Sequence, residues 1–170
     1  VRDLIDAGAT GDDVIRAAAE AHVRTADVDV DDPAQARDAQ QFLIALALRT
    51  TADTWPELTD VSRARHHESM AAFADFYADV MAIYGMRMKA PLTVMDFTEA
   101  MAAMGEGFAV RALEGIDHPR YDVAEADELP TGQWTLFALG VRALVNEFMT
   151  TIESAEDAEH PDGGGSSGAE

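Results

Sequence analysis

The sequence predicts an all-α fold, an antiparallel helical bundle of about five to six helices. Apolar residues recur three and four positions apart along most of the chain, which is the period of a helix, and almost no stretch alternates with the period of a strand. Residue patterns typical of helix starts stand before several of these stretches. The 170 residues are enough for one domain with a sizeable hydrophobic core.

The first two helices are expected to begin near residues 10 and 33. Thr10 and Asp13 have the spacing of a capping box, in which each side chain accepts a hydrogen bond from the other residue's backbone. This helix should end near residue 24. Asp32 followed by Pro33 marks the second start, and that helix should end near residue 50. Its segment FLIALAL is apolar on all sides, so we expect it to be central and buried.

A long third helix is expected from about Thr59 to Tyr84, where Gly85 ends it. Its apolar positions recur at helical spacing and predict a buried stripe. The stripe consists of Met70, Phe73, Tyr77, Val80, Met81 and Tyr84.

A fourth helix is expected to begin at a second capping box, Thr93 and Asp96, and to run to about Glu114, which Gly115 follows. Its apolar stripe includes Met101, Met104, Phe108 and Leu113. Methionine adapts to irregular shapes, so this stripe predicts either plain core or the wall of a ligand pocket.

The last helix is expected to follow a loop at residues 116–130, with Thr131 as its cap and Glu153 near its end. Its segment WTLFALGVRALVNEF is apolar almost all round, which implies cover on two sides. We interpret it as a homodimer interface formed by Trp134, Phe137, Val141, Leu144, Val145 and Phe148. The alternative is a helix enclosed in the core of a single chain. The domain should span residues 1–153, and the polar, Gly- and Ser-rich residues 154–170 should be a disordered tail.

The composition excludes several kinds of function. The net charge is −20, so the chain by itself should bind neither nucleic acid nor an anionic membrane. There are no cysteines, which excludes disulfides and zinc–thiolate sites and fits a cytoplasmic protein. The longest apolar run, Phe42 to Leu48, is far too short to span a membrane. Such acidity is typical of a salt-adapted organism, and a GC-rich genome favours the same residues.

No pattern of catalytic or metal-binding residues is convincing. The nearest match to a Glu-x-x-His metal motif, Asp157 to His160, lies in the tail. His66 and His67 are adjacent on a helix and point in different directions, so they do not form a chelating pair. Gly105-Glu-Gly107 lies within a helix and does not follow a strand. We therefore expect no enzyme activity, no metal and no cofactor.

The order of these segments is characteristic. FLIALALRTTADTWPEL comes first, then a long helix ending in IYG, then MRMKAPLTVMDFTEAMAAMGEGFAVRAL and a final apolar helix. From about residue 10 to 152, this order resembles the C-terminal regulatory domain of TetR-family transcriptional repressors. In many of these, a Thr-Val-x-Asp start opens a helix that contains Glu-Gly, here Thr93 to Asp96 and Glu106-Gly107.

The resemblance implies an all-helical effector-binding and dimerisation domain. In this family the last two long helices usually pair with their copies in a four-helix bundle, and the pocket lies among the central helices. The family's basic N-terminal helix-turn-helix has no counterpart in this chain, so DNA should be bound only through such a domain outside it. Binding of an effector would change the relative positions of the DNA-reading domains.

Two functions therefore compete. The first is the regulatory domain of a TetR-like transcriptional regulator that senses a small, hydrophobic molecule. The second is a free-standing helical dimer that binds a small molecule or another protein without DNA. Helical spacing predicts eight pocket residues, of which His66 and Tyr77 would be polar anchors. The predicted pocket residues are Phe42, His66, Met70, Phe73, Tyr77, Met101, Met104 and Phe108.

Overall fold

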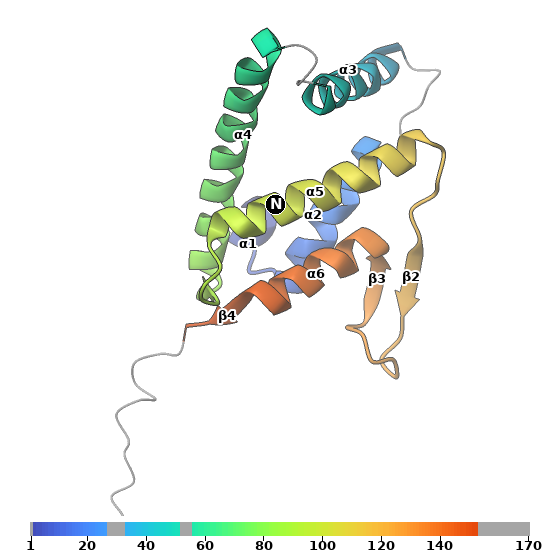
Figure 1. Cartoon of the computed structure of the whole chain (residues 1–170). Helices are drawn as coiled ribbons and strands as arrows, with labels where there is room; N and C mark the ends of the chain where they lie inside the picture. Colours follow the sequence, from blue (N-terminus) through green and yellow to red (C-terminus); the bar gives the residue numbers. More distant parts are fainter. Residues whose placement is uncertain (1, 27–32, 52–55, 153–170) are drawn as a thin grey trace, which may run out of the picture.

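The computed structural model describes residues 2–26, 33–51 and 56–152. In this part, helices dominate and strands are short (Figure 1). The helices are α1 (Arg2–Asp6), α2 (Gly11–Ala26), α3 (Pro33–Thr50), α4 (Pro56–Ile83), α5 (Val94–Leu113) and α6 (Leu136–Phe148). The strands are β1 (Met86–Met88), β2 (Arg120–Val123), β3 (Gly132–Thr135) and β4 (Met149–Thr151). The tail expected at residues 154–170 lies outside the described residues.

Both predicted capping boxes are confirmed. The backbone N–H of Asp13 donates to Thr10 Oγ1 over 3.2 Å, and the backbone N–H of Thr10 donates to Asp13 Oδ2 over 3.1 Å. Thr93 and Asp96 make the same two bonds at the start of α5, at 3.2 and 2.7 Å. These bonds occupy backbone donors that a helix leaves without partners at its N-terminus. Local sequence therefore determines where α2 and α5 begin.

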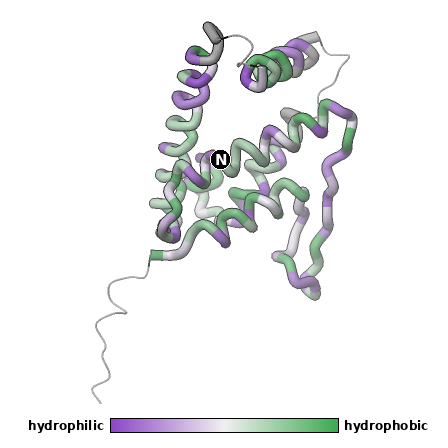
Figure 2. The backbone as a smooth tube through the Cα atoms, viewed as in Figure 1, coloured by the Kyte–Doolittle hydropathy of each residue, from purple (hydrophilic) through white to green (hydrophobic). Residues whose placement is uncertain are grey.

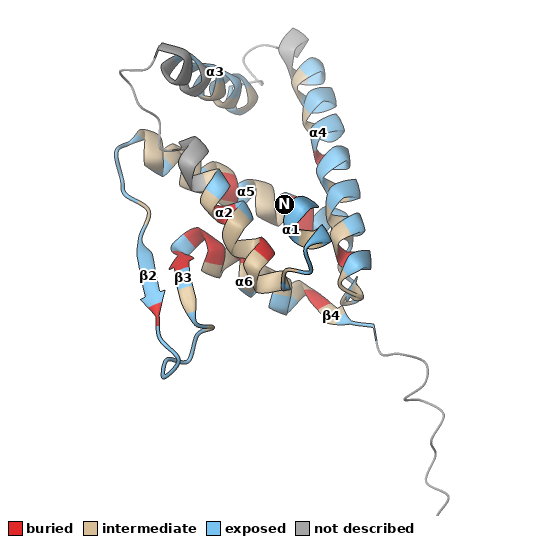
Figure 3. Cartoon of the chain, turned by 180° about the vertical axis from the view of Figure 1, so that it is seen from behind, coloured by how far each residue is buried: buried red, intermediate tan, exposed pale blue. Residues whose placement is uncertain are grey.

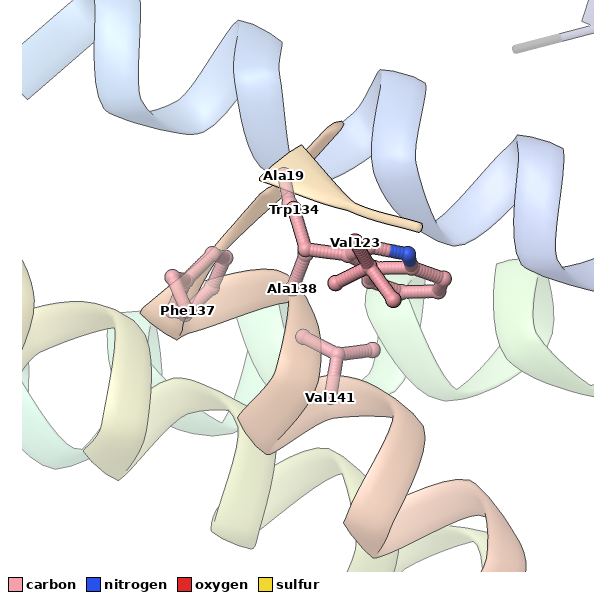
Figure 4. Packing of buried hydrophobic residues seen from close by; sticks show 6 residues of the cluster. All are labelled: Ala19, Val123, Trp134, Phe137, Ala138 and Val141. Atoms are coloured by element: carbon pink, nitrogen blue, oxygen red, sulfur yellow. The ribbon is translucent and has the colours of Figure 1, made fainter. Parts of the chain in front are cut away.

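The main hydrophobic core lies where α2, α6 and the β2–β3 pair meet. Its buried members are Ala19, Val123, Trp134, Phe137, Ala138 and Val141. Figure 4 shows these side chains between α2 and α6. Trp134 is 1% exposed, and its indole N–H donates to the carbonyl oxygen of Pro130 over 2.7 Å. A second cluster, formed by Met81, Phe97 and Met149, joins α4, α5 and β4.

The prediction of an all-α fold is right only in its coarser part, because the chain also contains two small antiparallel sheets. β1 pairs with β4, with Met86 opposite Thr151, and β2 pairs with β3, with Tyr121 opposite Trp134. Each strand has three or four residues. Such strands are too short for alternation to stand out in the sequence. In addition, β1 and β4 pair with each other although they lie far apart along the chain.

The predicted bounds of the last helix are wrong at both ends. The cap is Thr135 rather than Thr131, and its side chain accepts a hydrogen bond from the backbone N–H of Ala138. Trp134 therefore belongs to β3 and not to the helix. The helix ends at Phe148, because the next residues leave it to pair with β1. Pairing with other parts of the chain thus shortens the helix at each end.

The second predicted helix has its expected bounds, but its expected central position is wrong. Leu43, Ile44 and Leu48 of α3 are 44%, 52% and 42% exposed. Figure 2 shows hydrophobic positions, in green, along α3, which lies at the edge of the molecule. In Figure 3 the buried residues gather on α6, β3 and neighbouring elements, while α4 is mostly exposed. The core is filled by α2, α5 and α6, so α3 packs against α4 outside it.

Candidate functional site: a cavity between α2, α4 and α5

A cavity of about 700 Å³ is lined by side chains of α2, α4 and α5, with further residues from α3, α6, β1 and β4. Its lining is mainly aromatic, aliphatic and methionine side chains. Two lining residues, Phe73 and Phe76, are nevertheless 52% and 44% exposed. The cavity is therefore accessible to solvent on the side of α4.

One wall is the apolar stripe of α4. All six residues predicted for this stripe line the cavity, from Met70 to Tyr84. The ring of Tyr77 lies edge-on against Phe97 of α5, with centroids 5.1 Å apart. The hydroxyl of Tyr84 donates to the carbonyl oxygen of Ala9 over 2.8 Å, which ties the end of α4 to the segment before α2. These contacts hold the wall in place although much of α4 is exposed.

The opposite wall is formed where α2 crosses α5. Nε2 of His22 lies 3.2 Å from the carbonyl oxygen of Gly105, and its ring stacks on Phe137 with centroids 4.5 Å apart. A carbonyl only accepts, so Nε2 of His22 carries the proton and donates it. A Cβ on Gly105 would lie 3.4 Å from the His22 ring, which is ordinary van der Waals contact, so the ring packs directly on this turn of α5.

The ionisation state of His22 follows from its surroundings. Burial lowers the pKa of His22, and the bond to the Gly105 carbonyl opposes this shift only in part. At neutral pH the ring is therefore uncharged, with its proton on Nε2. Its other nitrogen, Nδ1, then carries a lone pair that can accept a hydrogen bond.

A polar cluster joins α3, α4 and α5 at the rim of the cavity. Arg49 of α3 forms an ion pair with Glu106 of α5 over 2.5 Å, and Glu106 also lines the cavity. Nδ1 of His66 on α4 lies 3.5 Å from Nη1 of Arg49, and its Nε2 lies 3.3 Å from Oε1 of Glu99. The cluster connects the outer helix α3 to α4 and α5, two of the three helices that form the cavity.

The structure brings together five of the eight residues predicted for a pocket. Phe42, Met70, Phe73, Tyr77 and Met101 line the cavity. Three others lie outside its lining: His66, Met104 and Phe108.

The residues outside the lining have other contacts. His66 belongs to the polar cluster at the rim. Met104 packs on α6, where its sulfur would lie 2.8 Å from a Cβ added to Gly140. The ring of Phe108 contacts Phe137, with centroids 5.2 Å apart. Two stripe residues of α5 therefore serve the packing between α5 and α6 rather than a pocket.

Sequence reasoning did not select His22 or Thr98 as site residues, although both line the cavity. The position of His22 on the apolar face of α2 was a usable signal. Thr98 is 1% exposed, and its hydroxyl donates to the carbonyl oxygen of Val94 over 2.9 Å. No sequence pattern distinguishes such a threonine from one on the surface of a helix.

The residues predicted for a dimer interface lie mostly inside the single chain. Trp134, Phe137 and Val141 are 1%, 5% and 8% exposed and belong to the main core. They have almost no surface left for a second chain, so the alternative of a helix enclosed in the core is correct for this face. The other three, Leu144, Val145 and Phe148, are partly buried against the second cluster.

Within residues 2–26, 33–51 and 56–152, no three histidine, aspartate or glutamate side chains lie close enough together to hold a metal ion. No helix in the same ranges is long and apolar enough to cross a membrane. In comparisons with known proteins, no family model, no curated protein and no solved structure matches this chain.

Proposed function

We propose that this chain is the effector-binding and dimerisation domain of a TetR-like transcriptional regulator, and that its effector is a small hydrophobic molecule. The observation that carries the proposal is the apolar cavity between α2, α4 and α5. The order of sequence segments described above adds the family resemblance. The cavity is the basis for ligand binding, and the resemblance is the basis for a role in transcription.

The size and lining of the cavity suit a small ligand. Its volume of about 700 Å³ falls within the range of about 300–1,000 Å³ that is usual for ligand pockets. Aromatic and methionine side chains adapt to varied apolar shapes. Phe73 and Phe76 expose much of their rings in this state, and a ligand that covered them would bury apolar surface favourably.

The position of α3 offers a route from ligand to regulation. Phe42 of α3 lines the cavity, and Arg49 of the same helix is paired with Glu106 of α5. A ligand that contacts Phe42 would therefore bias how α3 sits against α4 and α5. A coupling of about 1–3 kcal/mol between ligand and DNA binding is typical of such regulators. The DNA contacts would come from a separate basic domain, since this chain has a net charge of −20.

The proposed partner in the assembly is a second copy of the chain. The face of α6 that carries Leu136, Leu139, Ala143 and Leu144 is less covered than the face that carries Phe137 and Val141. Leu136 is 41% exposed and Ala143 is also exposed. Leu139 and Leu144 beside them are partly buried. Burial of this face against its copy would remove apolar surface from water, as a stable dimer requires.

The test of ligand binding is a cavity-filling variant. Ala18 lines the cavity yet is exposed, so Ala18→Trp adds bulk to the cavity without crowding the core. Binding of the neutral fluorescent dye N-phenyl-1-naphthylamine should weaken by at least about tenfold in this variant, because the ring occupies space that the dye needs. The matched control is Ala72→Trp, an exposed position of α4 outside the cavity lining, which should bind like the wild type. Equal binding by both variants would mean that the dye does not enter the cavity.

The test of the regulatory role is the intact mass of the protein in its source cells. A polypeptide longer than this 18.3 kDa chain by a basic helix-turn-helix domain supports the regulator. In that case, release of the full-length protein from its operator by ligand is the next measurement. A mass equal to that of the chain would instead favour the free-standing binding module.

A further inference from the structure

We propose that the cavity selects neutral molecules that carry a hydroxyl group on an apolar body, and that it discriminates against carboxylates of the same shape. The hydroxyl of Tyr77 would recognise the polar group of the ligand. This inference rests on the proposed ligand-binding function and adds to it the chemical class of the ligand.

The charge of the lining disfavours anionic ligands. Among the described lining residues, none is lysine or arginine, and the one acidic residue, Glu106, is already paired with Arg49. A carboxylate that entered would lose its hydration without meeting a positive charge, which is costly in apolar surroundings. The net charge of −20 also repels anions from the opening.

The hydroxyl groups that line the cavity differ in whether they already have a hydrogen-bond partner in the described part of the chain. The hydroxyl of Thr98 donates to Val94, and the hydroxyl of Tyr84 donates to Ala9. The hydroxyl of Tyr77, in contrast, forms no hydrogen bond with any part of the chain that the structure describes. A hydroxyl group of a ligand in the cavity can bond to it, because a hydroxyl both donates and accepts.

Tyr77 is well placed and in the right chemical state for this role. Its ring is held between Phe97, edge-on at 5.1 Å, and Phe76 at 5.5 Å between centroids. A ring held in this way loses little further freedom when its hydroxyl binds a ligand. Burial raises the pKa of Tyr77, so the group is a neutral phenol at physiological pH and can donate.

His22 adds a second polar contact that agrees with the same ligand class. Its Nε2 proton is used by Gly105, which leaves Nδ1 as an acceptor. Because burial keeps the ring uncharged, His22 offers no positive charge to a carboxylate. A neutral hydroxyl can donate to Nδ1, whereas a carboxylate cannot.

The experiment compares three ligands of similar shape as competitors of N-phenyl-1-naphthylamine. They are 4-hexylphenol, hexylbenzene and 4-hexylbenzoate, which differ only in the polar group. At about pH 7.5 the phenol is neutral and the benzoate is ionised. We expect 4-hexylphenol to bind about threefold to tenfold more tightly than hexylbenzene, as one hydrogen bond would provide. We expect 4-hexylbenzoate to bind at least about tenfold more weakly than the phenol.

The variant Tyr77→Phe removes the hydroxyl and keeps the ring. Its affinity for 4-hexylphenol should fall to that for hexylbenzene, while the affinity for hexylbenzene itself stays unchanged. The matched control is Tyr121→Phe on β2, which lies outside the cavity lining and should alter neither affinity. If Tyr77→Phe weakens all three compounds equally, the hydroxyl has only a structural role and the inference is wrong.

The outcomes separate this inference from the function on which it rests. If 4-hexylbenzoate binds as tightly as the phenol, the cavity is a ligand site but the proposed selectivity is wrong. The same conclusion follows if hexylbenzene binds as tightly as the phenol. If neither the dye nor any of the compounds binds, the proposed function fails, and the inference fails with it.

Discussion

Replacement of Phe137 by alanine should lower the free energy of unfolding by about 3–5 kcal/mol, the usual cost of removing a buried aromatic ring. Phe137 is 5% exposed, so folding removes almost all of its ring from water. Its ring contacts His22 and Phe108, with centroids 4.5 and 5.2 Å away. Each ring pair contributes about 0.5–1.5 kcal/mol beyond the buried area, which places the loss in the upper part of this range.

The assay is urea unfolding, followed by circular dichroism at a low and a high protein concentration. If Phe137 is core, the loss relative to the wild type should be the same at both concentrations, because the lost contacts lie within one chain. If Phe137 were an interface residue, the variant would instead be a folded monomer whose difference from the wild type grows with protein concentration.

Two further variants make the test decisive. Phe76→Ala removes the same ring at a position that is 44% exposed and should cost about 1 kcal/mol or less. Phe137→Leu keeps most of the volume and should cost about 1–2 kcal/mol if the alanine variant does not fold. A loss below about 1 kcal/mol for Phe137→Ala would refute the assignment of this residue to the core.

Three other predictions concern helix α5, helix α6 and pH. Gly107→Ala should raise the free energy of unfolding by up to about 1 kcal/mol, because the position is helical and exposed and has room for a Cβ. Gly140→Ala should bring no gain in stability, because its new Cβ would lie 2.8 Å from the sulfur of Met104. Thermal unfolding of both variants checks this prediction. Thr93→Ala should lower the melting temperature, and NMR titration should find the pKa of Asp96 closer to its ordinary value of 3.8, because the bonds from Thr93 hold it down. Burial lowers the pKa of His22 below its ordinary value of 6.5, so as the pH falls the unfolded chain binds a proton at this residue before the folded chain does. The free energy of unfolding should therefore decline as the pH falls below about 6.5. His22→Gln should remove this contribution to the decline, which urea unfolding at several pH values would measure.

Much of the helical framework could be predicted from the sequence because its signals are local. The capping boxes at Thr10 and Thr93 involve residues three positions apart, so no distant part of the chain is needed to form them. The stripe of α4 was equally readable, since Met70 and Tyr77 face the same way on any regular helix. The positive φ angle of 59° at Gly85, where the chain leaves α4, also follows from the residue type.

The division of one stripe between two roles could not be predicted. Met101 and Met104 lie one turn apart on α5, and their spacing suits either core or pocket equally well. Met101 lines the cavity, whereas Met104 packs against Gly140 of α6. The difference depends on which neighbouring helix lies opposite each residue, and helical period carries no information about that neighbour.

The sequence by itself determined a helix-dominated chain, the starts of α2, α3 and α5, and an apolar surface on α4 suited to a cavity wall. These features depend on residues within a turn or two of one another, whose interactions any regular helix contains. Only the tertiary structure decided that Trp134 leaves the last helix for β3, that Phe137 is core rather than interface, and that α3 lies at the edge. These outcomes depend on contacts between segments far apart in the chain, because an apolar face must be buried but does not specify what buries it.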